Sequence, residues 1–495
     1  MYATTDTLAT TPAAQGGRSR WLALYTLCAG MLMIVLDVTV VNVALPAIQD
    51  DLGFTSSSLA WVVNAYLIAF GGLLLLAGRL GDLLGRRNVF VGGLIVFTIA
   101  SVWCGLAQSQ ETLVIARFAQ GVGGALTSAV ILGMIVTLFP EPREQAKAIG
   151  VYAFVASAGG SIGLLAGGVL TQAINWHWIF FINLPIGALT AVLAVKLIAK
   201  DKGLGLGRGT DVPGAVLITA ALMVGVFTIV KPAAEEGWTA PRTLLLGLVT
   251  AVLLAGFIVR EATAATPLVP LRIFRSRNLT GANLIQALAT SGMFGIFFLG
   301  SLYLQRVLGY DALEIGLAFL PTTVVMGLLS VKYSEKLVMR FGPRRPLIAG
   351  LSLVVLGLAL FTQAPVDGNY FVHVLPVLAL LGFGGGICFP ALMGLSMADV
   401  KPEDAGLASG LIGTTAEVGA ALGLAVLATL SATRTAGLEA AGAAPLDALT
   451  SGYHLAFGIA AAIVAAAVVI ACTLMRPAKQ PVEVAEEEDL ALEAA

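Results

Sequence analysis

The chain has 495 residues, of which 58% are hydrophobic and only 12% are charged, and its mean hydropathy is +0.92. This composition excludes an ordinary soluble protein, which needs a more polar surface. The net charge of -1 at pH 7 offers no basic excess for nucleic acid. Apolar stretches of about 20 residues, the length that crosses a bilayer as a helix, recur along the chain and predict an all-α membrane protein.

Fourteen spans are predicted from the apolar stretches between polar breaks. A six-helix bundle is expected in residues 21–200 after a lead of 20 residues, with spans near 21–45, 58–78, 88–108, 112–138, 148–172 and 178–199. A linker with two extra helices is expected in 201–277, with spans near 212–231 and 243–259. A second six-helix bundle is expected in 278–476, with spans near 278–303, 313–331, 346–363, 372–396, 405–431 and 453–475, followed by an acidic tail, 477–495.

The basic residues predict the orientation of these spans. When successive loops are assigned to opposite sides of the membrane, 23 of the 28 Lys and Arg residues lie on the side of the N-terminus and four on the other side, and Arg117 lies within a span. The cytoplasmic loops of helical membrane proteins carry this excess. Both termini are therefore expected in the cytoplasm, and the protein is expected in a bacterial inner membrane.

Asp37 lies midway along the first predicted span. A carboxylate at bilayer depth costs roughly 2.5 to 3.5 kcal/mol unless it has a partner or faces a cavity. We therefore expect Asp37 to face a central cavity, where it could bind and release a proton. A helix-packing hydrogen-bond acceptor is the alternative.

Arg117 is the only basic residue within a predicted span. Arginine does not lose its charge in proteins, so this side chain must be paired or solvated. If Arg117 approached Asp37, the protonation of that carboxylate would depend on the distance between the two helices. A purely structural ion pair is the alternative.

The stretch GRLGDLLGRR, Gly78 to Arg87, places charges in the predicted cytoplasmic turn between the second and third spans. Arg86 and Arg87 contribute to the positive-inside signal, whereas Asp82 does not. Gly85, next to the two arginines, is a further candidate residue of this turn.

The chain also repeats itself. Residues 144–163 and 404–423 align without gaps at an offset of 260, and three glycines match in this alignment. Two related six-helix halves are typical of secondary transporters. The glycines of the fifth span predict close helix packing, with or without a role in transport: Gly159, Gly163, Gly167 and Gly168.

Polar and aromatic side chains within spans are candidates for a cavity that takes amphipathic compounds. They are Asn42, Asn64, Tyr66, Gln120, Asn283, Gln286, Phe294, Phe298 and Gln305. Glu417 in the thirteenth span is either a second proton site, a contact for cationic cargo, or a glutamate in a wide aqueous cleft.

Several motifs together resemble the major facilitator superfamily, in particular its fourteen-helix drug/proton antiporter branch. LDVTVVNVALP from Leu36 is similar to the first-helix motif, GRLGDLLGRR to the loop motif, and ARFAQGVGGA from Ala116 to the fourth-helix motif. LYLQRVLGYDALEIGLAFLP from Leu302 is similar to a segment that joins two helices of the second bundle. The resemblance covers nearly the whole chain.

The resemblance implies roles for these motifs. The charges of the loop motif are implied to gate the transporter, with Asp82 as a latch against the opposite half, and Arg117 is implied to act in proton transfer. Two departures stand out: the family's Gly-Pro is Gly163-Leu164 here, and Glu417 replaces a neutral or basic residue. The first departure keeps an importer as an alternative.

The function predicted is proton-coupled export of hydrophobic or amphipathic drugs by alternating access, without a cofactor or a metal. No nucleotide loop or catalytic constellation appears in the sequence, so an ion gradient is the expected energy source and an enzyme is not expected. The expected partners are the small-molecule cargo, protons and the bilayer, and a monomer suffices. The alternatives are an exporter of one native lipid, siderophore or metabolite, and a membrane sensor or scaffold that transports nothing.

Overall fold

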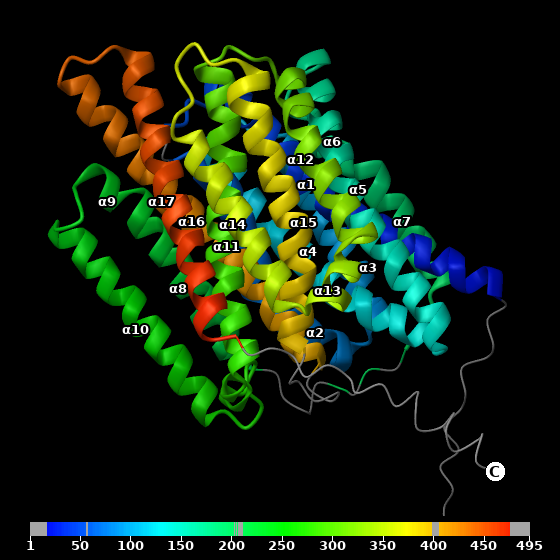
Figure 1. Cartoon of the computed structure of the whole chain (residues 1–495). Helices are drawn as coiled ribbons and strands as arrows, with labels where there is room; N and C mark the ends of the chain where they lie inside the picture. The colour runs from blue at the N-terminus through cyan, green and yellow to red at the C-terminus, as the bar shows by residue number, and fades with distance from the viewer. Residues whose placement is uncertain are drawn as a thin grey trace, which may run out of the picture. The chain divides into compact units, whose positions relative to one another are not determined.

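The computed structural model describes residues 17–55, 58–201, 203, 205, 211–397 and 405–475, and all regular elements in this part of the chain are helices (Figure 1). The chain divides into two compact units. Unit 1 comprises Met1–Leu268 and Leu304–Leu320, and unit 2 comprises Val269–Tyr303 and Pro321–Ala495.

Unit 1 contains the first ten helices. They are α1 (Gly17–Leu52), α2 (Ala60–Leu84), α3 (Arg86–Gly105), α4 (Gln110–Leu138), α5 (Pro142–Ala173), α6 (Trp178–Phe181), α7 (Asn183–Leu197), α8 (Val212–Val230), α9 (Pro232–Glu235) and α10 (Pro241–Thr263). The pairs α3 with α4, α2 with α4, and α1 with α5 are in extensive contact.

Unit 2 contains most of the remaining helices. In chain order these are η2 (Leu271–Arg275), α11 (Arg277–Arg306), α12 (Ala312–Lys332), α13 (Ser334–Phe341), α14 (Arg344–Phe361), η3 (Tyr370–Val374), α15 (Leu375–Met397), α16 (Ala405–Ala440) and α17 (Pro445–Thr473). Two of the three unit boundaries fall inside α11 and α12, because the connection between these two helices belongs to unit 1.

The described residues contain thirteen helices that are long and apolar enough to cross a membrane. A shorter apolar segment, Ile162–Ala173, lies in α5. The protein is therefore a multi-pass membrane protein, and the expected all-α fold with about fourteen spans is confirmed.

One span is interrupted. The chain from Trp178 to Leu197 is divided into α6 and α7 at Ile182. Pro185 lacks the N–H group that would bond to the carbonyl of Phe181, four residues earlier, so the helix is broken at this point. The break places Asn183 at the first position of α7.

The starts of α3 and α14 are built alike in the two units. Gly85 (φ +91°) precedes α3 and Gly342 (φ +71°) precedes α14, and both have the left-handed backbone that favours glycine. In unit 1, Arg87 Nη2 donates to the carbonyl of Val195 near the end of α7 at 2.6 Å. In unit 2, Arg344 Nε donates to the carbonyl of Ala471 near the end of α17 at 3.2 Å. A basic residue thus binds the negative end of a helix in both units.

The two extra helices, α8 and α10, pack against each other in unit 1 (Figure 1). At the start of α8, the buried Asp211 carboxylate accepts hydrogen bonds from Gly214 N at 3.1 Å and from Arg260 Nε at 2.8 Å. Large apolar side chains of α10, such as Leu244 and Leu248, are exposed. Their exposure fits a helix that faces lipid on much of its surface.

Candidate functional site

A fully buried ion pair joins α1 to α4 inside unit 1. Arg117 Nη1 lies 2.6 Å from Asp37 Oδ2, and the exposed fractions of the two residues are 1% and 0%. Charges at this depth are tolerated only when they are paired and hydrogen-bonded. The pairing considered from the sequence is therefore present in the structure.

The guanidinium of Arg117 is held on several sides. Its Nε donates to the carbonyl of Val62 on α2 at 2.9 Å, and its Nη1 also donates to Gln120 Oε1 at 2.6 Å. The ring of Tyr66 lies below the guanidinium, 4.5 Å from Cζ to the ring centroid. Because these contacts do not involve Asp37, they can hold Arg117 in place when the carboxylate changes its charge.

The carboxylate of Asp37 has two amide donors in addition to Arg117. Gln120 Nε2 donates to Asp37 Oδ1 at 2.6 Å, and Asn183 Nδ2 donates to the same oxygen at 3.0 Å. Both amides also donate to Ser101 Oγ, at 2.7 Å from Gln120 and 3.3 Å from Asn183. Helices α1, α3, α4 and α7 thus meet at one buried polar cluster, which we call the Asp37 cluster: Asp37, Ser101, Arg117, Gln120 and Asn183.

Helical spacing and small residues build this cluster. Arg117 and Gln120 are three residues apart, so they share one face of α4. A Cβ added to Gly123 would lie 2.4 Å from the backbone N of Phe97, and one added to Gly121 would lie 2.4 Å from the carbonyl of Tyr66. The glycines of α4 therefore let its backbone approach α3 and α2 closely enough for the polar groups to meet.

The Asp37 cluster can hold a charge pair away from water and respond to a proton. A proton on Asp37 would remove its attraction to Arg117 and would convert a hydrogen-bond acceptor into a donor. All three donors to the carboxylate would then face a neutral group. The arrangement can therefore link proton binding to the packing of α1 against α4 and α7.

In the loop motif of residues 78–87, the backbone and side chains of Arg86 and Arg87 make contacts within unit 1. Asp201 Oδ2 accepts a hydrogen bond from Arg86 N at 2.7 Å, and Asp201 Oδ1 accepts one from Arg87 N at 3.2 Å, so this carboxylate caps the start of α3. Arg86 Nη1 donates to the carbonyl of Gly133 on α4 at 3.0 Å. Gly78 lies in α2. Asp82 also lies in α2, but its side chain is outside the described residues, so its latch role stays a prediction.

The predicted packing glycines of α5 lie where this helix closely approaches neighbouring segments of unit 1. A Cβ on Gly163 would lie 1.9 Å from Thr39 Oγ1, and one on Gly167 would lie 2.9 Å from Val40 Cα, both on α1. Gly159 faces Leu32 and Val35 of the same helix, and Gly168 faces the backbone at Ala312 and Leu313.

The predicted cavity residues are divided between the two units. Unit 1 holds Asn42, Asn64, Tyr66, Gln120 and Gln305, and unit 2 holds Asn283, Gln286, Phe294 and Phe298. Tyr66 and Gln120 contact Arg117. Asn42 Nδ2 donates to the carbonyl of Val38 in its own helix at 3.2 Å. The amide of Asn64 is buried without a hydrogen-bond partner among the described residues.

Glu417 lies in α16 of unit 2, far along the chain from the Asp37 cluster, and is partly exposed. In the described part of unit 2, its carboxylate forms no ion pair. The neighbouring Thr415 Oγ1 donates to Asn283 Oδ1 on α11 at 2.8 Å. Asn283, one of the predicted cavity residues, is thus hydrogen-bonded to the helix that carries Glu417.

Three residues of the Asp37 cluster and of the contacts around the loop motif were not predicted from the sequence: Ser101, Asn183 and Asp201. Small polar residues are common in membrane spans, and their cross-helix partners are invisible in a single sequence. Pro185 was an available signal for Asn183, because a proline within a predicted span indicates a helix break and a polar residue beside it.

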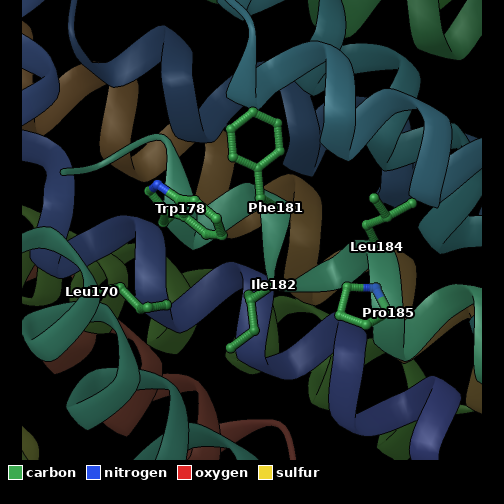
Figure 2. A pocket seen from close by; sticks show the side chains of 6 residues that line it. All are labelled: Leu170, Trp178, Phe181, Ile182, Leu184 and Pro185. Atoms are coloured by element: carbon green, nitrogen blue, oxygen red, sulfur yellow. The ribbon is translucent and has the colours of Figure 1, made fainter. Parts of the chain in front are cut away.

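A separate pocket of about 550 Å³ lies where α5, α6 and α7 meet (Figure 2). Its lining is apolar: Leu170, Trp178, Phe181, Ile182, Leu184 and Pro185. Ile182 and Leu184 border this pocket, whereas Asn183 between them is buried and bonds to Asp37. The helix break therefore separates an apolar pocket from the polar cluster.

Known proteins are similar to this chain over most of its length. The puromycin resistance protein pur8 of Streptomyces alboniger is 37% identical over 462 residues, which cover 92% of this chain and 91% of that protein. The cephamycin export protein CmcT of Amycolatopsis lactamdurans is 38% identical, with coverages of 90% and 91%. The multidrug resistance protein Stp of Mycobacterium tuberculosis is 34% identical, with coverages of 86% and 79%.

A solved structure and a family model agree with these relatives. The inward-facing bacterial homologue of the human lysosomal transporter Spinster has a TM-score of 0.66 at 18% identity, covers 94% of this chain and 100% of its own, and is similar in fold. The resemblance to the fourteen-helix drug/proton antiporter branch is confirmed by relatives named for drug resistance and export. The model described as Major Facilitator Superfamily matches residues 27–424. The chain therefore belongs to this superfamily of membrane transporters and is, as predicted, not an enzyme.

Proposed function

We propose that this transporter exports hydrophobic or amphipathic drugs in exchange for protons. The observation that carries the proposal is the buried pair of Asp37 and Arg117, whose atoms lie 2.6 Å apart within a hydrogen-bonded cluster. Two buried charges are expensive to keep in a membrane span, and a sensor or scaffold could hold its helices together by apolar packing instead. A carrier needs a group that binds and releases a proton in each cycle.

The proposed coupling acts through the charge of Asp37. In the cargo-loaded form Asp37 is ionised and binds Arg117, Gln120 and Asn183. When a proton enters from the outside, Asp37 becomes neutral and its attraction to Arg117 is lost, so α1 and α4 can change their packing. Each elementary charge that moves through 100 mV supplies about 2.3 kcal/mol, which is enough to concentrate cargo outside the cell.

The proposed cargo follows from the named substrates of the relatives. Pur8 is named for puromycin resistance, CmcT for cephamycin export and Stp for multidrug resistance. We propose a similar class of cargo here, with multidrug or self-resistance efflux as the physiological role. The polar and aromatic side chains proposed from the sequence are the candidate contacts for this cargo.

We also propose a topology with both termini in the cytoplasm of a bacterial cell. The support is the excess of Lys and Arg on one side of the predicted spans. The loop between α2 and α3 is then cytoplasmic, where Asp201 and the two arginines hold it. Asp82 is proposed as the gating charge of this loop, and the chain is proposed to work as a monomer.

Transport by inverted membrane vesicles tests the proposal. The vesicle lumen is loaded with acid, a panel of lipophilic cations and neutral drugs is added outside, and proton release is measured. The chain is compared with Asp37→Asn and with Asp447→Asn, which makes the same chemical change at an exposed position near the start of α17. We expect drug-dependent proton release from the unchanged chain and from Asp447→Asn, but none from Asp37→Asn.

Two other outcomes decide between the alternatives. If all drugs fail to release protons while the protein is folded, multidrug export is wrong, and an exporter of one native lipid, siderophore or metabolite becomes the better hypothesis. If drugs accumulate in the vesicles and Asp37→Asn releases protons as the unchanged chain does, export stands but Asp37 is not the coupling residue. Drug loss from preloaded vesicles that requires proton flow out of the acidic lumen would indicate an importer.

A further inference from the structure

Asn183 differs from the other members of the Asp37 cluster in how its amide is satisfied. Its Nδ2 donates to Asp37 Oδ1 at 3.0 Å and to Ser101 Oγ at 3.3 Å. Its Oδ1 is buried and has no hydrogen-bond partner among the described residues. A buried amide oxygen without a donor is costly, so its presence beside a carboxylate requires an explanation.

Gln120 provides the contrast. Its Nε2 donates to Asp37 and Ser101, and its Oε1 accepts from Arg117 Nη1 at 2.6 Å and from Cys104 Sγ at 3.6 Å. Rotating this amide by 180° would place its NH₂ group against the donors of Arg117. Gln120 is therefore fixed in one orientation, whereas the free oxygen of Asn183 leaves that amide able to rotate.

We infer that Asn183 is a positioning residue that changes orientation with the protonation of Asp37. This inference rests on the proposed proton coupling and adds α7 to it. In the ionised state, the NH₂ group of Asn183 donates to the carboxylate. In the protonated state, the amide is rotated about its Cβ–Cγ bond, and its Oδ1 accepts a hydrogen bond from the acid.

The proton balance of this step is simple. A proton from hydronium in the outside solution forms an O–H bond at Asp37 Oδ1, a water molecule is left behind, and the negative charge of the carboxylate is lost. The hydrogen bond from Asn183 Nδ2 to Asp37 Oδ1 breaks, and one from the Asp37 hydroxyl to Asn183 Oδ1 forms. The rotation also breaks the hydrogen bond from Asn183 Nδ2 to Ser101 Oγ, and one from the Ser101 hydroxyl to Asn183 Oδ1 can form in its place. On deprotonation all of these changes run in reverse, and no other covalent bond is made or broken.

Apart from the contact with Asp37, the two orientations are nearly balanced. In the present orientation, Ser101 Oγ accepts two hydrogen bonds, and no described contact uses its hydroxyl as a donor. After rotation, Asn183 Oδ1 would face both this hydroxyl and the Asp37 acid. Each orientation leaves one amide group without a partner, Oδ1 before the rotation and Nδ2 after it. The protonation of Asp37 therefore decides which orientation is favoured.

The other ionisable groups at the cluster leave this role to Asn183. Arg117 on α4 faces the carboxylate and stays charged. Cys104 on α3 donates to Gln120, and the ring of Tyr66 on α2 lies against Arg117. Of these three groups only Arg117 has a described contact with the Asp37 carboxylate, and a charged guanidinium cannot accept a hydrogen bond from the acid.

Infrared spectroscopy of the full chain in liposomes tests the inference without a transport assay. Asparagine is labelled with ¹³C at the side-chain carbonyl, and difference spectra are recorded as the pH is changed. We expect a ¹³C-sensitive amide band that changes with the same midpoint as the carboxyl band of Asp37. Both bands should be absent from Asp37→Asn, the amide band alone should be absent from Asn183→Leu, and both should remain in Asn175→Gln, a change at an exposed loop residue.

Transport by variants gives a second test. Proton-driven efflux requires Asp37 to gain and lose a proton, whereas exchange of labelled for unlabelled drug uses only the cargo-loaded form. We expect Asn183→Leu to slow efflux about tenfold, as expected when a buried acid loses its acceptor, and to leave exchange within about twofold. Asn183→Ser, whose hydroxyl both donates and accepts, should restore part of the efflux.

The outcomes separate this inference from the proposed function. A carboxyl band of Asp37 without any change in the asparagine band overturns the role of Asn183 and leaves proton coupling intact. Equal losses of efflux and exchange in Asn183→Leu mean that Asn183 is only structural. If the unchanged chain shows no Asp37 carboxyl band over the whole pH range, the proposed coupling itself is wrong.

Discussion

Arg117 Nη1 on α4 approaches Asp37 Oδ2 on α1 to 2.6 Å, and neither side chain has appreciable contact with solvent. Two residues that are 80 positions apart in the chain thus form the electrostatic centre of unit 1. Removing one partner leaves the other as an uncompensated buried charge. The stability of unit 1 therefore depends on the same pair on which we propose that transport depends.

A double-mutant cycle should reveal this dependence. We expect Arg117→Met alone to lower the free energy of unfolding by about 3–5 kcal/mol, because it leaves a buried carboxylate unpaired. The double variant Asp37→Asn/Arg117→Met should be markedly more stable than the sum of the single changes predicts. Unfolding in detergent, followed by circular dichroism, measures all four proteins.

The exposed pair of Arg242 and Glu236 is the control for this cycle. Its atoms lie 2.9 Å apart, but its side chains are 52% and 37% exposed. Such pairs contribute about 0.2–1 kcal/mol. A cost for Arg117→Met as small as that of Arg242→Met would show that the buried pair does not hold α1 to α4.

The fold and the centre of the site could be predicted because their signals are strong in one sequence. Long apolar stretches indicate spans, and a charge such as Asp37 or Arg117 inside a span is conspicuous. Gln120 lies within the fourth predicted span, where a polar side chain is a candidate for a cavity.

Other parts of the site depend on contacts that the sequence does not reveal. Ser101 and Asn183 are ordinary polar residues until the helices pack, and their role comes from the shared oxygen of Asp37. Asp201 caps α3 from 115 residues further along the chain. Pairings over such separations follow from tertiary structure rather than from local pattern.

Asp201 gives a second prediction, about the first turn of α3. Asp201→Ala removes the acceptor for the backbone N–H groups of Arg86 and Arg87, so we expect a loss of about 0.5–2 kcal/mol in the free energy of unfolding and slower transport. Asp201→Asn keeps a side-chain oxygen and should lose less. Thermal unfolding and drug efflux measure both effects, and equal behaviour of Asp201→Ala and the unchanged chain would rule out the capping role.

The glycines of α5 give a third prediction. In Gly167→Ala the new Cβ would meet the backbone of Val40 at 2.9 Å, so the helices must separate, at a cost of about 1–3 kcal/mol. In Gly163→Ala the first obstacle is the side chain of Thr39, so Thr39→Ala should rescue it in part. Gly247→Ala on α10, where no atom lies within 4 Å of the new Cβ, is the control. Thermal unfolding distinguishes these variants, and rescue of Gly167→Ala by Thr39→Ala would contradict the packing argument.

Glu417 gives a fourth prediction, about cargo. An unpaired carboxylate on a membrane span attracts cations more than neutral compounds. We expect Glu417→Gln to reduce transport of lipophilic cations at least severalfold while neutral drugs are exported as before. Glu439→Gln, at an exposed position near the end of the same helix, should change neither. If transport of both classes falls together, Glu417 serves as a proton site instead.

His177 gives a prediction about pH at the end of α5. Its ring stacks on Trp176, with centroids 3.7 Å apart, and Trp176 Nε1 donates to Asp51 Oδ2 at 2.9 Å. Burial lowers the pKa of His177 below its ordinary value of 6.5, and the charge of Asp51 opposes this shift only in part. A histidine with a lowered pKa binds its proton more weakly in the folded state than in the unfolded state. Its contribution to stability is therefore complete above pH 6.5 and is lost as the pH falls through its folded-state pKa.

The measurement for His177 compares unfolding temperatures between about pH 8 and pH 5. We expect the unchanged chain to lose more stability on acidification than His177→Gln, because glutamine cannot take up the proton. His373→Gln, which removes a histidine from unit 2, is the control for a general effect of histidine loss. Parallel pH curves for the unchanged chain and His177→Gln would mean that the stacked ring does not titrate differently in the folded state. A gap that opens only below pH 6.5 would place the acid-sensitive contact at the junction of Asp51, Trp176 and His177.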